Sequence, residues 1–513
     1  MKKPSKFLTF TLLSFCIVLP AFAWRSTTYY IKDSLKYCVR EDSSYVMVSV
    51  MAVADSLQLP VTENGTLVIP ASVTLEGRTY KVGDIEDDGF RFHPEIKHLV
   101  LSEGIEFIGN NAFWLCLNLE SIHFPTTFSG MEISAFKGCS GLKSITVEYG
   151  NKTFDSRDNC NALIKTKWNE LVLGCQSTQV PEGIVAIGSG AFSGQQNLEC
   201  IILPNSLKEI GNYAFIDCTG LKQVTLPDSL ETIRNQAFAG CTSLEKLFIP
   251  ASVSKIEERI VTNCPILKRL VVSPENKTYD SRDNCNAIIK SKDNCLIAGC
   301  CSTNIVDGIK SIAKQALWGS GITSISIPAS VTQISEEAFS YCRFCSSIEV
   351  AADNPVYDSR ENCNAIIETS TGTLVKGCGV TSFPKSVSKI GNYAFCGMTL
   401  PSNLVIPEGI TAIGEYAFTG CRFYSLVLPK SLRDIGFSAF THCQDMERVV
   451  MNCTDLQIGS HAFCYCYSLY AVQLPQNSKY SHPRLGLCQV RDGIFITQFS
   501  LIFKASDMRS LIS

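Results

Sequence analysis

The feature that most constrains the fold is an Ala-Phe pair that returns along the chain at fixed intervals. The position of its Phe occurs thirteen times, at spacings of 23, 23, 56, 23, 23, 23, 56, 22, 56, 23, 22 and 23 residues. These positions are Phe90, Phe113, Phe136, Phe192, Phe215, Phe238, Val261, Leu317, Phe339, Phe395, Phe418, Phe440 and Phe463. Each interval of 56 equals 23 plus 33, so a longer unit is inserted three times. A period of this size is typical of stacked repeats rather than of several separate domains.

Each short unit contains a strand with an inner and an outer face. Leu247 and Ile249 stand two residues apart, so both point to one side of a strand. Pro250 ends that strand because proline cannot donate to a strand ladder. The Ile-Gly-x-x-Ala-Phe segment is predicted to form one helical turn whose Phe fills the space between units. One unit cannot bury its apolar stripe alone, whereas stacked units can.

The long unit carries its own signature. Its three copies begin at Asn151, Asn276 and Asn354 with Asn-x-x-x-Asp-Ser-Arg and end in a Gly-Cys pair, 15 residues after an Asn-Cys-Asn motif. Short apolar runs around polar turn residues predict a β-hairpin in each copy. The sequence therefore predicts an α/β, β-rich solenoid of about 16 coils, thirteen short and three long. At about 4.8 Å per coil it is expected to be a rod of roughly 80 Å.

The repeat Leu-x-x-Leu-x-Leu-Pro … Ile-Gly-x-x-Ala-Phe-x-x-Cys resembles the BspA-type (treponemal-type) leucine-rich repeat of exported proteins of Bacteroidetes and spirochaetes. The resemblance covers about residues 60–475, and residues 66–82 are similar to the β-rich cap that precedes such arrays. It implies a leucine-rich-repeat solenoid with a binding role, including adhesion to host or bacterial surfaces, and it implies no catalytic residues. The departures are Val261 and Leu317 at Phe positions, Gln195 at a Cys position, and the tail after Pro475.

The chain starts with the features of a secretory signal peptide. Lys2, Lys3 and Lys6 precede an apolar run over residues 7–20, and Ala-Phe-Ala at 21–23 fits cleavage after Ala23. No later segment has 18 or more uninterrupted apolar residues, so no transmembrane segment is predicted. We expect a secreted, cell-surface or outer-envelope protein. The predicted domains are the signal peptide (1–23), a β-rich N-terminal cap (24–82), the solenoid (83–475) and a C-terminal tail or cap (476–513).

The 25 cysteines form two main groups. One group stands three residues after the Phe position and is predicted to be a ladder of buried thiols, because stacked coils offer poor disulfide geometry. Its members are Cys116, Cys139, Cys218, Cys241, Cys264, Cys342, Cys421, Cys443 and Cys466. The second group flanks the hairpins as the pairs Cys160/Cys175, Cys285/Cys300 and Cys363/Cys378. For these pairs a disulfide and two free thiols are both open interpretations, since an oxidising compartment would allow the bridge.

The rest of the sequence offers little chemistry. Lys plus Arg is 45 and Asp plus Glu is 48, a formal charge of −3 that argues against a nucleic-acid partner. No catalytic motif, metal site or cofactor site is predicted. The Asp-Ser-Arg-Asp/Glu-Asn loops at 155–159, 280–284 and 358–362 are interpreted as turns with a local Arg–carboxylate pair rather than Ca²⁺ sites. The Cys-x-x-Cys at Cys342 and Cys345 has no second ligand pair for zinc and is assigned no redox role.

The predicted binding site is the strand face turned away from the core, because it alternates with the buried positions. Its candidate residues are His123, Ile202, Thr225, Lys246, Phe248, Arg269, Val271, Arg448 and Val450. A long exposed apolar patch usually marks an interaction site, although good β-formers on an ordinary sheet surface give the same pattern.

Three classes of function follow. The leading one is a non-catalytic, adhesin-like protein that binds a host or bacterial surface protein or glycoprotein. The second is a structural envelope protein that associates with itself. An enzyme is the least supported, because no acid, base or nucleophile stands outside the repeat pattern.

Overall fold

The computed structural model describes residues 26–41, 46–52, 59–474, 495–498 and 501–502. They form a solenoid of about 17 coils, in which a main strand of three or four residues and a short strand of two residues alternate. The predicted β-rich solenoid is therefore confirmed, and the described residues contain no α-helix. The predicted signal peptide, and nearly all of the tail after Pro475, lie outside these residues. The domain boundaries stay a prediction.

The strands fall into four groups. The main strands are β4 (Thr66–Ile69), β8 (His98–Leu101), β10 (Ser121–Phe124), β12 (Ser144–Val147), β17 (Cys200–Ile202), β19 (Gln223–Thr225), β21 (Lys246–Ile249), β23 (Arg269–Val272), β28 (Ser324–Ile327), β30 (Ser347–Val350), β35 (Asn403–Val405), β37 (Ser425–Leu428), β39 (Arg448–Met451) and β41 (Ala471–Leu474). The short strands are β7 (Asp84–Ile85), β9 (Phe107–Ile108), β11 (Gly130–Met131), β16 (Ala186–Ile187), β18 (Glu209–Ile210), β20 (Thr232–Ile233), β22 (Lys255–Ile256), β27 (Ser311–Ile312), β29 (Gln333–Ile334), β34 (Lys389–Ile390), β36 (Ala412–Ile413), β38 (Asp434–Ile435) and β40 (Gln457–Ile458). The long units contain β13 (Phe154–Asp155), β14 (Ala162–Lys165), β15 (Glu170–Gly174), β24 (Tyr279–Asp280), β25 (Ala287–Lys290), β26 (Cys295–Gly299), β31 (Tyr357–Asp358), β32 (Ala365–Glu368) and β33 (Thr373–Gly377), with the 3-10 turns η1 (Arg157–Asn159), η2 (Arg282–Asn284) and η3 (Arg360–Asn362). The two ends of the chain contribute β1 (Ser26–Lys32), β2 (Leu35–Glu41), β3 (Val46–Ala52), β5 (Ser72–Leu75), β6 (Arg78–Lys81), β42 (Phe495–Gln498) and β43 (Leu501–Ile502).

Main strands of successive coils pair in parallel and in register. Ile122 of β10 lies between Leu99 of β8 and Ile145 of β12, and all three side chains are buried. The second and fourth residues of a typical main strand point into the core, while the first and third point outward. This alternation confirms the strand orientation that the sequence predicts.

The Phe residues of the repeat form stacks inside the solenoid. Phe90 and Phe113 have ring centroids 5.3 Å apart and nearly parallel planes, as do Phe395 and Phe418 at 5.0 Å. Val261 and Leu317, which replace Phe in two coils, are buried at the equivalent place. Each ring therefore packs on its counterpart in the next coil, which is how adjacent units share one core.

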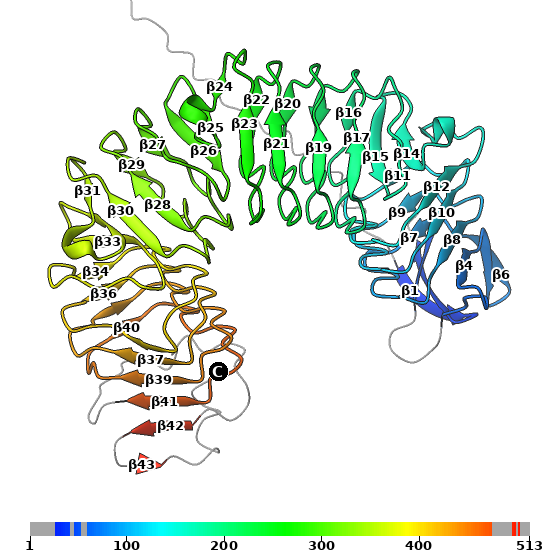
Figure 1. Ribbon diagram of the computed structural model, residues 1–513. Coiled ribbons are helices and arrows are strands. Elements are labelled where there is room, and N and C mark those ends of the chain that lie inside the picture. Colours follow the sequence, from blue (N-terminus) through cyan, green and yellow to red (C-terminus); the bar gives the residue numbers. More distant parts are fainter. Residues whose placement is uncertain (1–25, 42–45, 53–58, 475–494, 499–500, 503–513) are drawn as a thin grey trace, which may run out of the picture.

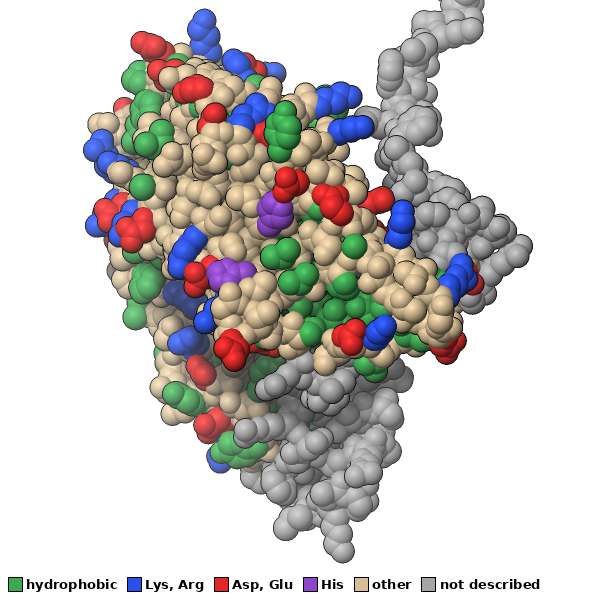
Figure 2. Space-filling view, turned by 90° about the vertical axis from the view of Figure 1, so that its right-hand side faces the viewer, with side chains coloured by type: hydrophobic (Ala, Val, Ile, Leu, Met, Phe, Trp, Pro, Cys, Tyr) green, Lys and Arg blue, Asp and Glu red, His purple; other side chains and the backbone are tan. Residues whose placement is uncertain are grey.

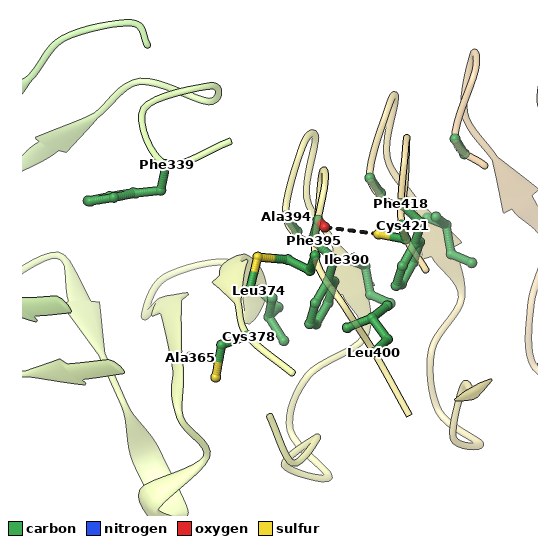
Figure 3. Close-up of a cluster of buried hydrophobic side chains, with 14 of the residues drawn as sticks. Phe339, Ala365, Leu374, Cys378, Ile390, Ala394, Phe395, Leu400, Phe418 and Cys421 are labelled. Carbon is green, nitrogen blue, oxygen red and sulfur yellow. Dashed lines mark hydrogen bonds between the residues drawn. The ribbon is translucent and has the colours of Figure 1, made fainter. Parts of the chain in front are cut away.

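The predicted thiol ladder is confirmed, and each of its nine thiols has a defined acceptor. Cys421 donates to the main-chain carbonyl of Phe395 over 3.0 Å (Figure 3), and Cys116 donates to that of Phe90 over 3.0 Å. The others donate in the same way, to the carbonyl at the Phe position of the preceding coil. All nine are buried. A cysteine suits this place because it is small and apolar and still carries a weak donor.

The Ile-Gly-x-x-Ala-Phe segment does not form the predicted helical turn. Non-glycine residues with positive φ stand two before the Phe position in most coils, as at Tyr213 (58°) and Tyr393 (56°). A second left-handed residue often follows two after it, as at Asp217 (58°). Left-handed residues at both ends prevent a right-handed helical turn, so the segment is a series of tight turns that presents Ala and Phe to the core.

The predicted hairpins are confirmed in all three long units. β14 pairs with β15, β25 with β26 and β32 with β33, each antiparallel with a bulge at the same place. Ala162 and Ile164 of β14 pack into the core that follows, whereas Leu163 packs into the core that precedes. Each hairpin is thus a partition with both faces buried. We call the three places where a hairpin separates two coils the first, second and third joints (residues 136–195, 261–320 and 339–398).

The rod that the sequence predicts is curved into an arc (Figure 1). At each joint the loops of the flanking coils still touch directly: Gly138 donates to the Ser193 carbonyl at 3.1 Å, Asn263 to Trp318 at 2.9 Å and Tyr341 to Cys396 at 2.9 Å. The hairpin therefore adds chain on one side of the coil only. The helical turns of the long units lie on the outer edge of the arc, as expected for three wedges inserted on that side.

Candidate interaction surface

All nine predicted binding residues lie on the outward strand face, which we define as the first and third side chains of the main strands. Each of them is exposed or partly exposed. The joints divide them among three sheets: His123 lies on the first, and Arg448 and Val450 lie on the last. The other six lie together on the four-stranded sheet β17–β19–β21–β23 between the first two joints. The orientation of the predicted residues is confirmed, and their role in binding stays a prediction.

The sheet β17–β19–β21–β23 carries a continuous row of apolar or weakly polar side chains. Ile202 pairs with Thr225, and Phe248 pairs with Val271 in the parallel register. Ile202 is 85% exposed and Phe248 is 50% exposed. Thr225 lies between them in the row, which thus runs Ile202, Thr225, Phe248 and Val271 across the four strands and forms one largely apolar patch, a feature typical of interaction sites. Cys200, the exposed cysteine next to Ile202, lies on the same face.

Two cations stand directly beside this row. Lys246 and Arg269 are paired residues of adjacent strands. Within the described part of the chain, neither forms a salt bridge. By contrast, Lys222 and Glu199, which directly precede β19 and β17, form a salt bridge at 2.9 Å. Like charges directly opposite each other in a sheet are destabilising, so this arrangement favours an anionic group from outside the chain.

On the first sheet, the outward side chains of β10 and β12 are polar. His123 contacts Thr146 through Nδ1 at 3.0 Å and Glu148 through Nε2 at 3.2 Å, while His98 contacts Ser121 at 2.8 Å. A hydroxyl, an imidazole and a carboxylate in contact are the parts of a nucleophilic triad. The Thr146 hydroxyl lies 3.0 Å from His123 Nδ1 and 3.4 Å from the Ile122 carbonyl oxygen, so two groups are within hydrogen-bond distance of its one proton.

Beyond the second joint the outward strand face changes character twice. Ser324 and Ser326 of β28, with Ser347 and Glu349 of β30, make a polar segment. Val405, Val427 and Val450 then form a second apolar row beside Arg448.

The sequence did not single out Val68, which is 47% exposed and pairs with Val100. Its strand shows the same alternation before Pro70, but it lies in the segment assigned to the cap.

The Asp-Ser-Arg loops of the long units contain the predicted Arg–carboxylate pairs. Arg157 binds Asp155 through Nε and Nη2 at 2.8 and 2.6 Å, and Arg282 binds Asp280 in the same way. Hydrogen bonds from Arg360 hold the pKa of Asp358 below its ordinary value, against the effect of partial burial. In the described ranges, no group of three or more His, Cys, Asp or Glu side chains is placed to hold a metal ion.

The cysteines at the hairpins are free thiols. Cys160 and Cys175, Cys285 and Cys300, and Cys363 and Cys378 are buried and unbridged. The sequence left a disulfide and two free thiols open for each pair, and the structure shows two free thiols in all three. Burial raises the pKa of Cys300 to about 11.

Two further properties of the surface bear on partners. Over the face seen in Figure 2, Lys and Arg side chains are interspersed with Asp and Glu, and no large area of one sign stands out. Across the residues that the structure describes, no helix is long and apolar enough to pass through a membrane.

A family model described as the BspA type leucine rich repeat region matches the chain in six copies, over residues 73–172, 170–287, 293–365 and 376–483. Among solved structures, a leucine rich cell surface protein of Faecalibacterium prausnitzii is similar over 95% of this chain and 98% of its own, with 19% identity and a TM-score of 0.35. A leucine-rich repeat protein of Bacteroides ovatus is similar over 92% and 100%, with 21% identity and a TM-score of 0.32. The pneumococcal vaccine antigen PcpA is similar over 95% and 96%, with 17% identity and a TM-score of 0.34. No curated protein sequence matches the chain.

Proposed function

Because the chain belongs to the BspA-type leucine-rich repeat family, we propose that it is a non-catalytic, adhesin-like protein that binds a partner protein through its outward strand face. The proposal rests on the sheet between the first and second joints. There an exposed apolar row, with Ile202 and Phe248, lies beside Lys246 and Arg269, two cations that form no salt bridge with any residue the structure describes. Such a combination of apolar area and complementary charge is what protein interfaces use.

The partner that fits this surface is a protein with apolar and acidic side chains close together. Carboxylates would relieve the repulsion between Lys246 and Arg269, and apolar side chains would cover Phe248 and Ile202. The interspersed charges elsewhere (Figure 2) support a protein or glycoprotein of a host or bacterial surface rather than a nucleic acid, which requires a basic face.

The proposed location is outside the cell, either secreted or on the cell surface. It is supported by the signal-peptide pattern in residues 1–23, with cleavage after Ala23. Catalysis is not part of the proposal, because the family model that the chain matches describes a leucine rich repeat region and the sequence contains no catalytic motif.

The experiment starts with purified residues 24–513, screened by biolayer interferometry against extracellular-matrix proteins, mucins and bacterial surface extracts at physiological salt. Phe248→Glu and the pair Lys246→Glu with Arg269→Glu are then compared with Ser326→Glu, a matched substitution on the polar segment of the same face. We expect the first two changes to weaken binding at least about tenfold, since each removes a central contact, and Ser326→Glu to leave it unchanged.

Equal affinity of all variants, with normal circular dichroism, would contradict the proposal. Assembly that depends on concentration and needs no foreign partner would instead favour the structural, self-associating protein.

A further inference from the structure

The third joint differs from the other two at the positions where hairpin and preceding coil pack together. The equivalent residues are Cys139, Leu142 and Leu173 at the first joint, Cys264, Leu267 and Ala298 at the second, and Cys342, Cys345 and Lys376 at the third. Each of the first two sets lies within one apolar core cluster. At the third joint, Cys345 stands where the other joints have leucine. Lys376 stands where they have the aliphatic Leu173 and Ala298. The shorter Cys345 leaves room for the longer Lys376.

Lys376 is buried without a partner. It is 3% exposed, in the middle of β33, opposite the fully buried Ile366. Among the described residues its Nζ has no hydrogen-bond acceptor. A buried ammonium without a counter-charge is costly, so such groups are usually paired. At the first and second joints the apolar Leu173 and Ala298 fill this place, so the fold itself does not need a charged side chain there.

The groups around Lys376 are thiols. After burial itself, the Lys376 charge has the largest effect on the pKa of Cys342, Cys345 and Cys396, and it lowers all three. Burial, the larger effect, raises the pKa of Cys345 to about 12. The lysine therefore favours the thiolate form in a core that otherwise suppresses it. A nearby cation is the usual means by which a cysteine becomes reactive.

The backbone already brings two of these thiols together. The amide of Cys345 donates to the carbonyl of Cys342 at 3.1 Å, which closes a tight turn of four residues. The Cα atoms at the ends of such a turn are less than about 7 Å apart, which includes the range that a disulfide needs. The two residues between them, Arg343 and Phe344, are exposed. Cys342 and Cys345 are themselves 0% and 4% exposed, so both thiols lie beneath this exposed turn.

We propose that Cys342 and Cys345 are an oxidisable thiol pair, activated by Lys376, that a peroxide converts to a disulfide. The Cys345 thiolate attacks hydrogen peroxide, breaks its O–O bond and becomes a sulfenic acid, with release of hydroxide. The Cys342 thiol then attacks that sulfur, so that the S–S bond forms and the oxygen leaves as water. In total, two thiols and one peroxide give one disulfide and two waters. Cys345 reacts first because its hydrogen bond to Ser347, at 3.6 Å, is longer than the 3.1 Å bond from Cys342 to Leu317.

The test exposes the reduced, purified protein to hydrogen peroxide. Samples are then denatured, alkylated and analysed by peptide mass spectrometry. We expect the peptide that contains Cys342 and Cys345 to lose two hydrogen atoms and escape alkylation, while Cys139 and Cys264 of the other joints stay alkylatable. The Lys376→Leu variant, which copies Leu173, should form the bond several-fold more slowly, because it removes the charge that lowers the pKa of both thiols. Lys376→Met serves as a second variant if Lys376→Leu alters the circular dichroism spectrum.

Three results would overturn the proposal. The first is full alkylation of Cys342 and Cys345 after peroxide treatment, and the second is a bond that forms equally fast without the lysine. The third is oxidation of Cys342 in a Cys345→Leu variant at the rate seen in the unchanged protein, which would mean that Cys345 is not the attacking thiol.

Discussion

The thiol of Cys218 donates a hydrogen bond to the main-chain carbonyl oxygen of Phe192, one coil earlier, over 3.0 Å. The same oxygen accepts the amide of Gln195 at 3.1 Å. Both lone pairs of a buried carbonyl are thus satisfied, one from within its own turn and one from the next coil. Because the same bond recurs at the other eight ladder cysteines, the ladder connects successive coils through hydrogen bonds in the core rather than through disulfides.

Replacing Cys218 by alanine tests this connection. Cys218→Ala removes a buried sulfur and one of the two donors to the Phe192 carbonyl, so we expect a loss of about 1–2 kcal/mol in the free energy of unfolding. The midpoint of urea unfolding, followed by circular dichroism, measures it. Cys200→Ala, at an exposed position, is the control and should stay within about 0.5 kcal/mol. An unchanged midpoint for Cys218→Ala would show that the thiol contributes nothing.

The buried thiols also predict that the protein loses stability in alkali. Burial raises the pKa of Cys116 and of Cys264 to about 12, from an ordinary value of 9.0. The folded chain therefore keeps these protons while the unfolded chain loses them. The resulting stability is complete below pH 9 and is lost as the pH rises from 9 towards 12.

The measurement is the urea midpoint at about pH 8 and about pH 10, which we expect to be lower at the higher pH. Each fully protected thiol contributes up to about 1.4 kcal/mol per pH unit within this window. The Cys116→Ala variant lacks one of these thiols. Its urea midpoint should already be lower at about pH 8, and it should fall less between about pH 8 and about pH 10. A midpoint that stays level or rises would contradict the prediction.

The sequence was sufficient to predict the coils, their ladders and the outward strand face. The constant spacing of Phe and Cys requires that equivalent side chains stack, and strand alternation fixes which side chains leave the core. That is why the sequence alone assigns Phe248 and Ile202 to the surface and Cys218 to the interior.

The curvature and the cluster of Lys376 with Cys342 and Cys345 at the third joint could not be predicted in the same way. A 33-residue insertion gives the length of added chain but not the side of the coil that receives it. The direct contact of Gly138 with Ser193 shows that side. Likewise, Lys376 follows an ordinary strand pattern in the sequence. Only the packing of the hairpin against the preceding coil places it among Cys342 and Cys345.

The constant position of the Gly-Cys pair in the three long units has a physical reason in the hairpin geometry. A Cβ added to Gly174 would lie 2.2 Å from Cε1 of Phe192, the ring that begins the next stack. Gly377 stands in the same relation to Phe395. We therefore expect Gly174→Ala to destabilise the protein by about 2 kcal/mol or more, because the close-packed ring cannot yield without strain.

Thermal unfolding monitored by circular dichroism checks this expectation. The control is Gly83→Ala, since a Cβ there has nothing within 4 Å and its φ is not left-handed. Equal melting temperatures for the two variants would mean that the hairpin can shift to make room, and that the contact does not determine how the joint packs.

Lys376 provides a last test, one of stability rather than reactivity. Its ammonium is buried without an acceptor among the described residues, and the equivalent residue of the first joint is Leu173. Replacing an unpaired buried charge by an aliphatic side chain of similar volume removes its desolvation penalty. We expect Lys376→Leu to stabilise the reduced protein by about 2 kcal/mol, measured as an increase in the urea midpoint with Leu173→Lys as the inverse change. A lower midpoint for Lys376→Leu would mean that the ammonium is already balanced by a thiolate in the resting protein, since removing one partner of a buried ion pair destabilises.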